Sequence, residues 1–333
     1  MPSSDVLGQV PGFSRQLSVL LLRRGSLLAF AGILAVFAVT APHFLSAGNI
    51  ANVFAQSAIL GILAFGLTCV VIGGGSHVVS GGLDLSLAAN LGVCAAVYSS
   101  LNNAGVNAPQ AIGLTLMCGL AVGALNGFTV VVLRLPPLLA TLASMNLIAG
   151  LELVLTQNSV LPTDSAVLDA LVDGVWLHVP ALAWVLLGTG LLLGLLIQHS
   201  PYGLRLYAVG EYPEAARAAG LNVKAYVFSS YLLAGLCAAV AAFCSAAYFS
   251  GSTTGSGDLL LSVVAITFLG VVFSRRLVAN IPGTLLAALL LGFLINGFQL
   301  LSIASFWVNG VQGVLILLVV ALSSALRQEE GGQ

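Results

Sequence analysis

The sequence predicts an all-α polytopic membrane protein, a single transmembrane domain of about ten helices. Three observations predict it: an apolar composition, a series of long apolar runs, and an uneven distribution of cations. Of the 333 residues, 59% are hydrophobic and 6% are charged, whereas a soluble domain carries roughly 25% charged residues. Because one membrane-spanning helix takes about 20 apolar residues, the chain has room for roughly eight to twelve spans and for no large soluble domain.

Apolar runs bounded by Pro, Gly, Asn or charged residues define the candidate spans. They cover residues 24–41, 50–73, 83–101, 109–133, 137–157, 180–198, 224–249, 258–273, 282–301 and 306–326. The first run lacks a small-residue cleavage pattern, so we expect it to remain attached as a span. The whole chain, 1–333, is then one transmembrane domain with spans over 24–326, a longer polar loop over 199–223, and tails over 1–23 and 327–333.

The cations fix the predicted orientation. If the N-terminus is cytoplasmic, all 10 Lys and Arg residues fall in inner segments. The outer segments contain none, and three acidic residues lie in one of them: Asp164, Asp169 and Asp173. Since cytoplasmic loops carry an excess of Lys and Arg, the split predicts an even number of spans and cytoplasmic N- and C-termini.

Short polar motifs recur in the two halves of the chain at nearly equal separations. They are Gly82–Ser86 (GLDLS) followed by Gly123–Gly127 (GALNG), and Gly257–Leu260 (GDLL) followed by Gly292–Gly297 (GFLING). In the ten-span threading Asp84 faces the inner side and Asp258 the outer side. The halves would therefore cross the membrane in opposite directions, an inverted repeat of the kind that transporters build around their substrate route.

The polar loop over 199–223 predicts one short cytoplasmic helix from Glu211 to Gly220. Pro213 suits a helix start, Glu214 complements the helix dipole there, and Gly220 suits the stop. Such a helix is too short to anchor in lipid and suits docking into a groove of another protein. A solvated connector is the other interpretation. The docking candidates are Gly210, Glu211, Pro213, Glu214, Ala215, Ala216, Arg217 and Gly220.

Few ionisable residues approach the spans. We expect Glu152 to be an interfacial residue near the outer end of the fifth span, and Asp84 and Asp258 to cap helix starts, with a gating role as the alternative for Asp84. Uncharged amides lie deeper and can bond the hydroxyl groups of a neutral solute, or they can join neighbouring helices. The candidates for the translocation route are Asp84, Asn90, Asn126, Asn146, Asn296 and Gln299.

Catalytic and cofactor motifs are absent from the sequence. The only Lys, Lys224, is not part of a GxxxxGK[ST] phosphate loop, the 4 His are scattered, and the 5 Cys fall in apolar runs without metal-ligand spacing. We expect no catalytic residue, metal or cofactor, and the net charge of −1 gives no basis for nucleic-acid binding. Energy for transport would come from a partner ATPase or from an ion gradient.

Several segments carry a resemblance to a known family. YGLRLYAVGEYPEAARAAGLNVKAYVFSSYLLAGLCAAVAAF at 202–243, GGLDLSLAANLGVCAAV at 81–97, GALNGFTVVVLRLPPLLATLASM at 123–145 and FWVNGVQGVLILLVVAL at 306–322 resemble, in order, the permease subunits of bacterial sugar-type ABC importers, the ribose, galactose, xylose and autoinducer-2 group. The sequence departs from the family pattern at residues 73–80, which are extra, and at 273–280, which replace a Gly-rich loop.

The resemblance implies an inner-membrane permease that acts as a homodimer or as half of a heterodimer. It further implies that the 211–220 helix inserts into a cytoplasmic ATP-binding subunit and that a periplasmic binding protein delivers a monosaccharide. Two alternatives stay open: a gradient-driven carrier or passive channel acting alone, and an importer permease for amino acids or nucleosides.

Overall fold

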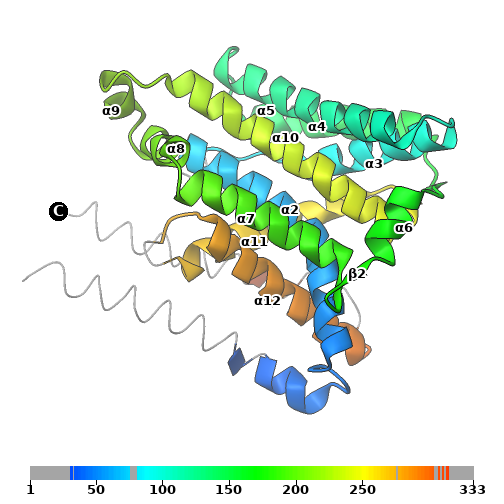
Figure 1. Cartoon of the computed structure of the whole chain (residues 1–333). Helices are drawn as coiled ribbons and strands as arrows, with labels where there is room; N and C mark the ends of the chain where they lie inside the picture. The colour runs from blue at the N-terminus through cyan, green and yellow to red at the C-terminus, as the bar shows by residue number, and fades with distance from the viewer. Residues whose placement is uncertain are drawn as a thin grey trace, which may run out of the picture.

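The computed structural model describes residues 31–32, 34–75, 81–274, 277–303, 307, 310 and 313–314. Within these ranges the chain is a bundle of helices with very short strands (Figure 1). The helices from residue 47 onward are α2 (Ala47–Gly74), α3 (Leu87–Asn103), α4 (Ala108–Val131), α5 (Pro137–Thr156), α6 (Ala166–Val172), α7 (Ala181–Gln198), α8 (Pro201–Glu211), α9 (Pro213–Ala218), α10 (Val223–Tyr248), η1 (Ser256–Asp258), α11 (Leu259–Phe273) and α12 (Ile281–Leu300). The strands form two antiparallel pairs, β1 (Leu161–Pro162) with β4 (Gly251–Ser252) and β2 (Val175–Trp176) with β3 (Val179–Pro180).

The predicted spans match the helices closely where the structure describes them. In the described ranges 7 helices are long and apolar enough to cross a membrane: α2, α4, α5, α7, α10, α11 together with η1, and α12. The 17-residue α3 begins later than the predicted start at residue 83, because residues 82–85 form a non-helical approach to it. Of the predicted span 24–41, residues 31–32 and 34–40 are helical. The last predicted span, 306–326, lies almost wholly outside the described residues.

Polar side chains determine where several of these helices begin. Ser46, Asn107, Asn222 and Asn280 each accept a hydrogen bond from a backbone N–H three residues later. These N-caps satisfy donors that the first helical turn leaves free. An apolar run with a capping residue at its start therefore carries enough information to place these helix boundaries.

Helices α2 and α10 pack against each other at the centre of the bundle. The end of α2 lies beside α8, since the backbones of Gly75 and Gly210 touch, and α10 begins directly after α9. The two helices therefore run in opposite directions. α10 packs on α3 and α4, and α2 packs on α11 and α12, so each of the two central helices contacts helices of the other half of the chain.

The two equivalent helix pairs approach closely through small residues. Where α4 meets α10, a Cβ atom on Gly235 would collide with the backbone of Gly119, and one on Gly123 would collide with the Tyr231 carbonyl oxygen. Where α12 meets α2, a Cβ on Gly292 would collide with Ser57. Small residues let membrane helices approach to backbone contact, so these glycines set the distance between the central helices.

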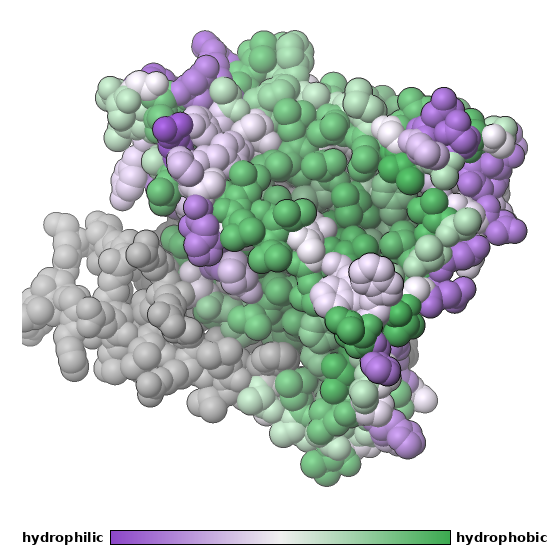
Figure 2. Space-filling model, in the orientation of Figure 1, coloured by the Kyte–Doolittle hydropathy of each residue, from purple (hydrophilic) through white to green (hydrophobic). Residues whose placement is uncertain are grey.

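Hydrophilic residues gather at two opposite ends of the bundle, with an apolar belt between them (Figure 2). The described cations, Arg134, Arg205, Arg217 and Lys224, all lie near the α8–α9 end. The acidic residues of the 158–179 segment lie with β1 and α6 at the opposite end (Figure 1). The described cations and these acidic residues therefore lie at opposite ends of the bundle.

Candidate functional site

The predicted docking loop forms two helices rather than one. α8 ends at Glu211, Tyr212 adopts a non-helical conformation, and α9 begins at Pro213. The single helix expected from Glu211 to Gly220 is therefore wrong, because the residue before a proline is disfavoured in the α conformation. Gly220 does follow the end of α9, with φ of 83°, a conformation in which glycine is the favoured residue.

The surface of α9 is almost completely exposed. Glu214 and Arg217 form an ion pair, Nη1 to Oε2 2.6 Å, with side chains 82% and 58% exposed respectively. Pro213, Ala215 and the preceding Glu211 are also exposed, whereas Ala216 packs inward. An exposed pair of this kind adds little stability, so α9 presents a polar surface without needing it for folding.

In contrast, α8 is firmly attached to the bundle. Its Gly210 packs on the last turn of α2 at Ile72, where a Cβ atom would collide. The Tyr207 hydroxyl donates to the Ala279 carbonyl oxygen at 2.7 Å, in the loop before α12. Burial raises the pKa of Tyr207 to about 12. A displacement of α8 would therefore be passed to α2 and to the start of α12.

Asp84 is the centre of a buried polar cluster at the end of the bundle near α8. Its Oδ1 accepts hydrogen bonds from the Ser86 N–H at 2.9 Å and the Ser86 hydroxyl at 2.7 Å. The Asn126 amide reaches both carboxylate oxygens at 3.3 Å and the Ser86 Oγ at 2.6 Å. Asp84 is 2% exposed. Asp84 and Asn126 therefore bond each other directly and are also linked by Ser86, a residue that was not among the predicted route residues.

Two further polar atoms near this cluster lack a partner. The Asn126 Oδ1 and the Tyr231 hydroxyl are buried without a hydrogen bond. Tyr231 lies on α10 where α4 approaches it through Gly123, one turn before Asn126. Because buried polar groups are usually hydrogen-bonded, these atoms are available to a hydroxyl group or a water molecule.

The other route candidates do not join this cluster. Asn90 is buried and donates to the Gly119 carbonyl oxygen at 3.3 Å, between α3 and α4. Asn296 forms a reciprocal amide pair with Asn49, at 2.8 and 3.0 Å, at the start of α2, the end away from α8. Asn146 and Gln299 are exposed, on α5 and α12 respectively. Asn90 and Asn296 therefore join helices, while Asn146 and Gln299 face outward.

The predicted correspondence between the two halves fails at these side chains. Asp258 is exposed and, although it is the N-cap residue of α11, its side chain makes no capping bond. It is not paired with Asn296, which bonds Asn49 instead. Asp84 differs from the expected helix cap as well, since it binds Ser86 and the N-cap of α3 is Ser86 itself.

The prediction that Glu152 is an interfacial residue is wrong, because it is buried. Its side chain is 4% exposed and its Oε1 has no hydrogen-bond partner. The α5 buried face, of which it is part, packs on α3. Only its position near a span end is predictable from the sequence, because its neighbours come from distant segments.

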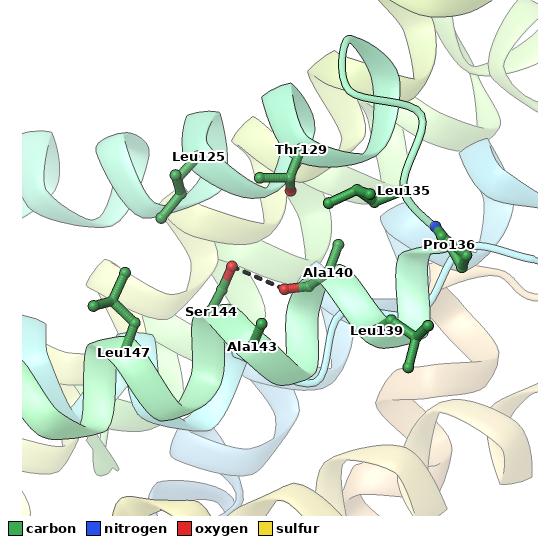
Figure 3. A pocket seen from close by; sticks show the side chains of 9 residues that line it. All are labelled: Leu125, Thr129, Leu135, Pro136, Leu139, Ala140, Ala143, Ser144 and Leu147. Atoms are coloured by element: carbon green, nitrogen blue, oxygen red, sulfur yellow. Dashed lines mark hydrogen bonds between the residues drawn. The ribbon is translucent and has the colours of Figure 1, made fainter.

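A groove of about 300 Å³ lies between α4 and α5 (Figure 3). Its lining is mainly Leu, Ala and Pro, and the two hydroxyl residues are Thr129 and Ser144. Ser144 already donates to the Ala140 carbonyl oxygen at 3.0 Å. The groove thus offers little to a hydroxylated solute, and it contains none of the predicted route residues.

Comparison with known proteins identifies the family. The family described as "Branched-chain amino acid transport system / permease component" matches residues 49–320. The chain belongs to this permease family. It is 31% identical to the ribose import permease protein of Escherichia coli (strain K12), over 91% of this chain and 94% of that protein. The ribose import permease protein of Bacillus subtilis (strain 168) is 32% identical over 84% and 86%.

The family relationship confirms the predicted class of membrane permease. The autoinducer 2 import system permease protein of Photorhabdus luminescens is 27% identical over 91% of this chain and 89% of its own length. No solved structure matches the chain. A permease of this family is the multi-pass membrane component of a transport system, and no group of three or more His, Cys, Asp or Glu in the described residues is arranged to hold a metal.

Proposed function

We propose that the chain is the permease subunit of a binding-protein-dependent ABC importer that moves a small neutral polar solute, a monosaccharide, across the bacterial inner membrane. The observation that carries the proposal is the match to ribose import permeases along nearly the whole chain. The unpartnered Asn126 Oδ1 and Tyr231 hydroxyl suit a hydroxylated solute, because they can hydrogen-bond it without adding charge.

The α8–α9 end is the cytoplasmic end in this proposal. The described cations at that end support it, since Lys and Arg are retained on the cytoplasmic side. Both termini then lie in the cytoplasm and the β1–β4 end faces the periplasm, where a solute-binding protein docks. A cysteine placed at the exposed Ala215 of α9 tests the threading: an impermeant thiol reagent added to intact cells should not reach it, and labelling there would reverse the orientation.

The exposed α9 is the docking element for a separate ATP-binding subunit. Its polar residues make few contacts within the chain, while α8 connects it to α2 and α12. Closure of two ATPase subunits would displace α9, and α8 would pass the movement to the buried end of α2. Since the sequence contains no phosphate loop, the chain supplies the route and the partner supplies the hydrolysis.

The exposed face of α5 supports a second permease copy. Of the seven span-length helices α5 is the least buried, since only 28% of its apolar stretch lies inside the bundle. It nevertheless carries the exposed amide of Asn146 at its middle. An amide facing lipid at that depth is unfavourable. We place a second copy or a paralogue against this face, with the small residues Ala143 and Gly150 allowing close approach and Asn146 facing the shared route.

Disulfide trapping tests this dimer. Cysteines cross-link when their Cα atoms lie within about 7 Å, so Asn146→Cys should trap dimers in native membranes. Leu192 of α7 is 70% exposed, and Leu192→Cys is the matched control that should not trap dimers. Cross-linking only when a paralogous permease is co-expressed indicates the heterodimer, and equal cross-linking of the two variants contradicts the assignment of α5.

A gradient-driven carrier is the second candidate function, because two carboxyl groups, Asp84 and Glu152, are buried inside the bundle. Intramembrane carboxyls are typical of proton-coupled transporters. Reconstitution in liposomes separates the two functions. The importer takes up labelled pentose or hexose only with ATPase, ATP and binding protein, whereas uptake by the purified chain alone would establish the carrier. Competing branched-chain amino acids and nucleosides in the same assay test the solute class.

A further inference from the structure

Glu152 occupies an unusual position at the end of the bundle opposite α9. A Cβ atom on Gly92 of α3 would lie 2.5 Å from the Glu152 Oε2 and 2.8 Å from the Ser256 Oγ of η1. The carboxyl group therefore reaches the one place on α3 where the missing side chain leaves room for it. Three elements, α3, α5 and η1, meet at this point.

The segment that meets α3 beside Glu152, at Gly92, crosses the end of the bundle without an α-helix. It runs from β4 to η1, Gly251–Asp258, and we name it the β4–η1 segment. At one end β4 pairs with β1, Ser252 with Leu161, and at the other Ser256 is buried beside Gly92. Its Ser252 hydroxyl is buried without a partner, as are the Ser99 hydroxyl of α3 and the Glu152 Oε1. A short two-residue strand pair and few satisfied polar groups hold this segment loosely compared with the helices.

No cation balances Glu152 within the described residues. Arg134, the cation next to α5, precedes the helix, and 15 residues of α5 place Glu152 about 22 Å beyond the helix start. The titratable side chains on the elements around Glu152 are Cys94 and Tyr98 of α3, Cys118 of α4 and Asp258 of η1. Tyr98 is engaged with Ser165 at 2.7 Å, and the Cys94 thiol donates to Asn90 at 3.4 Å.

A buried carboxylate that has no cation beside it, and one oxygen without a hydrogen-bond donor as Glu152 has, is disfavoured in such an interior, and the neutral acid is favoured. We propose that Glu152 is a proton-binding residue that, as the neutral acid, holds the β4–η1 segment closed against α3 and α5. When the segment moves away, water reaches the carboxyl group and the proton leaves to the aqueous phase at that end. The inference goes beyond the proposed function and uses it only to identify that phase as the periplasm.

The direction of the pH effect follows from linkage. The closed state binds one proton more than the open state, so closure is favoured at low pH and is lost as the pH rises. Opening would increase by at most about tenfold per pH unit, the limit for one released proton. A glutamine at position 152 resembles the neutral acid in shape and cannot ionise, so it should remove the pH dependence.

Accessibility of Ser252 tests the proposal in the full chain. Ser252 is completely buried and its hydroxyl makes no hydrogen bond, so Ser252→Cys is a mild reporter for an impermeant thiol reagent. Ser159→Cys, exposed at the same end, corrects for the pH dependence of thiol reactivity itself. We expect the corrected labelling rate to rise between pH 6 and pH 9, and to be independent of pH after Glu152→Gln. A flat rate in the unmodified background, or the same rise in both, overturns the proposal.

Infrared spectroscopy provides a second measurement that needs neither opening nor transport. The difference spectrum between the parent chain and Glu152→Gln at pH 5 should contain the carbonyl stretch of one protonated carboxyl group. Its absence shows an ionised Glu152 and overturns the proposal. Neither measurement requires ATPase, binding protein or solute, so failure of importer activity would count against the proposed function alone.

Discussion

Asp84 and Glu152 are both buried carboxyl groups beside α3, Asp84 just before its start and Glu152 against Gly92, and their surroundings differ completely. Asp84 accepts hydrogen bonds from a backbone N–H, a hydroxyl and an amide. Glu152 lies against a glycine and its Oε1 has no partner. Donors stabilise a carboxylate, whereas their absence favours the neutral acid. The two acids are equally buried but differ in their donors, so we assign them different roles. The Asp84 cluster holds its end of the bundle together, whereas Glu152 can respond to its surroundings.

Removing the Asp84 carboxylate should have the largest effect. Asp84→Leu leaves the Ser86 and Asn126 donors buried without their acceptor, and we expect a loss of about 3 kcal/mol or more of stability. Thermal unfolding in detergent measures it. Asp258→Leu, at the corresponding position of the second half but exposed, is the matched control and should change stability by less than about 0.5 kcal/mol. Equal effects would contradict the difference between the two halves.

Gly92→Ala tests the contact between α3 and the Glu152 carboxyl group. The added methyl group would lie too close to Oε2 and to the Ser256 Oγ, and such overpacking costs about 1–3 kcal/mol. Shortening the acid should relieve part of the collision. In a double-mutant cycle with Glu152→Ala we expect a coupling energy of at least about 0.5 kcal/mol. Additive effects would mean that the two residues do not touch.

Tyr207 lies outside the spans, and burial opposes the ionisation of its hydroxyl group, as it does for a buried acid. Its pKa is raised to about 12 by burial, from about 10 in an unfolded chain. The neutral form therefore contributes stability that is complete below pH 10 and is lost as the pH rises toward 12. Tyr207→Phe should remove this alkaline loss and should cost about 1 kcal/mol at neutral pH, for the bond to Ala279. Unfolding curves at pH 7 and pH 11 check both; an unchanged alkaline loss contradicts the assignment.

Glu214 is the exposed counterpart of the two buried acids, and its replacement should have the smallest effect on stability. Glu214→Gln breaks the exposed pair with Arg217, worth at most about 0.5 kcal/mol. If α9 is the docking element, co-purification with the ATP-binding subunit and uptake should nevertheless fall. Asp169→Gln, on α6 at the opposite end, is the control that should leave both unchanged. If co-purification and uptake both persist in Glu214→Gln and in Arg217→Gln, the docking role is excluded.

The helices were largely predictable because their signals are local. An apolar run with Asn107 or Asn280 at its start places a helix boundary from adjacent residues alone. The tertiary contacts are not local: Asn49 and Asn296 are 247 residues apart, and Glu152 meets Gly92 and Ser256 from separate elements. Identical residue types at corresponding positions, such as Asp84 and Asp258, gave no sign that one is buried and the other exposed. Pro213 is a local signal for a helix break at Tyr212. The good helix formers after it favoured a single helix instead, so the break was not predicted.

The contact of α4 with α10 limits how the bundle can change shape. At Gly119 and Gly235 main-chain atoms meet directly, so no rotamer change can absorb a shift of one helix along the other. These two helices must travel together as a rigid body. Sliding during transport is then confined to boundaries filled by longer side chains, and a cycle that separated α4 from α10 would first have to dismantle the packing that determines their spacing.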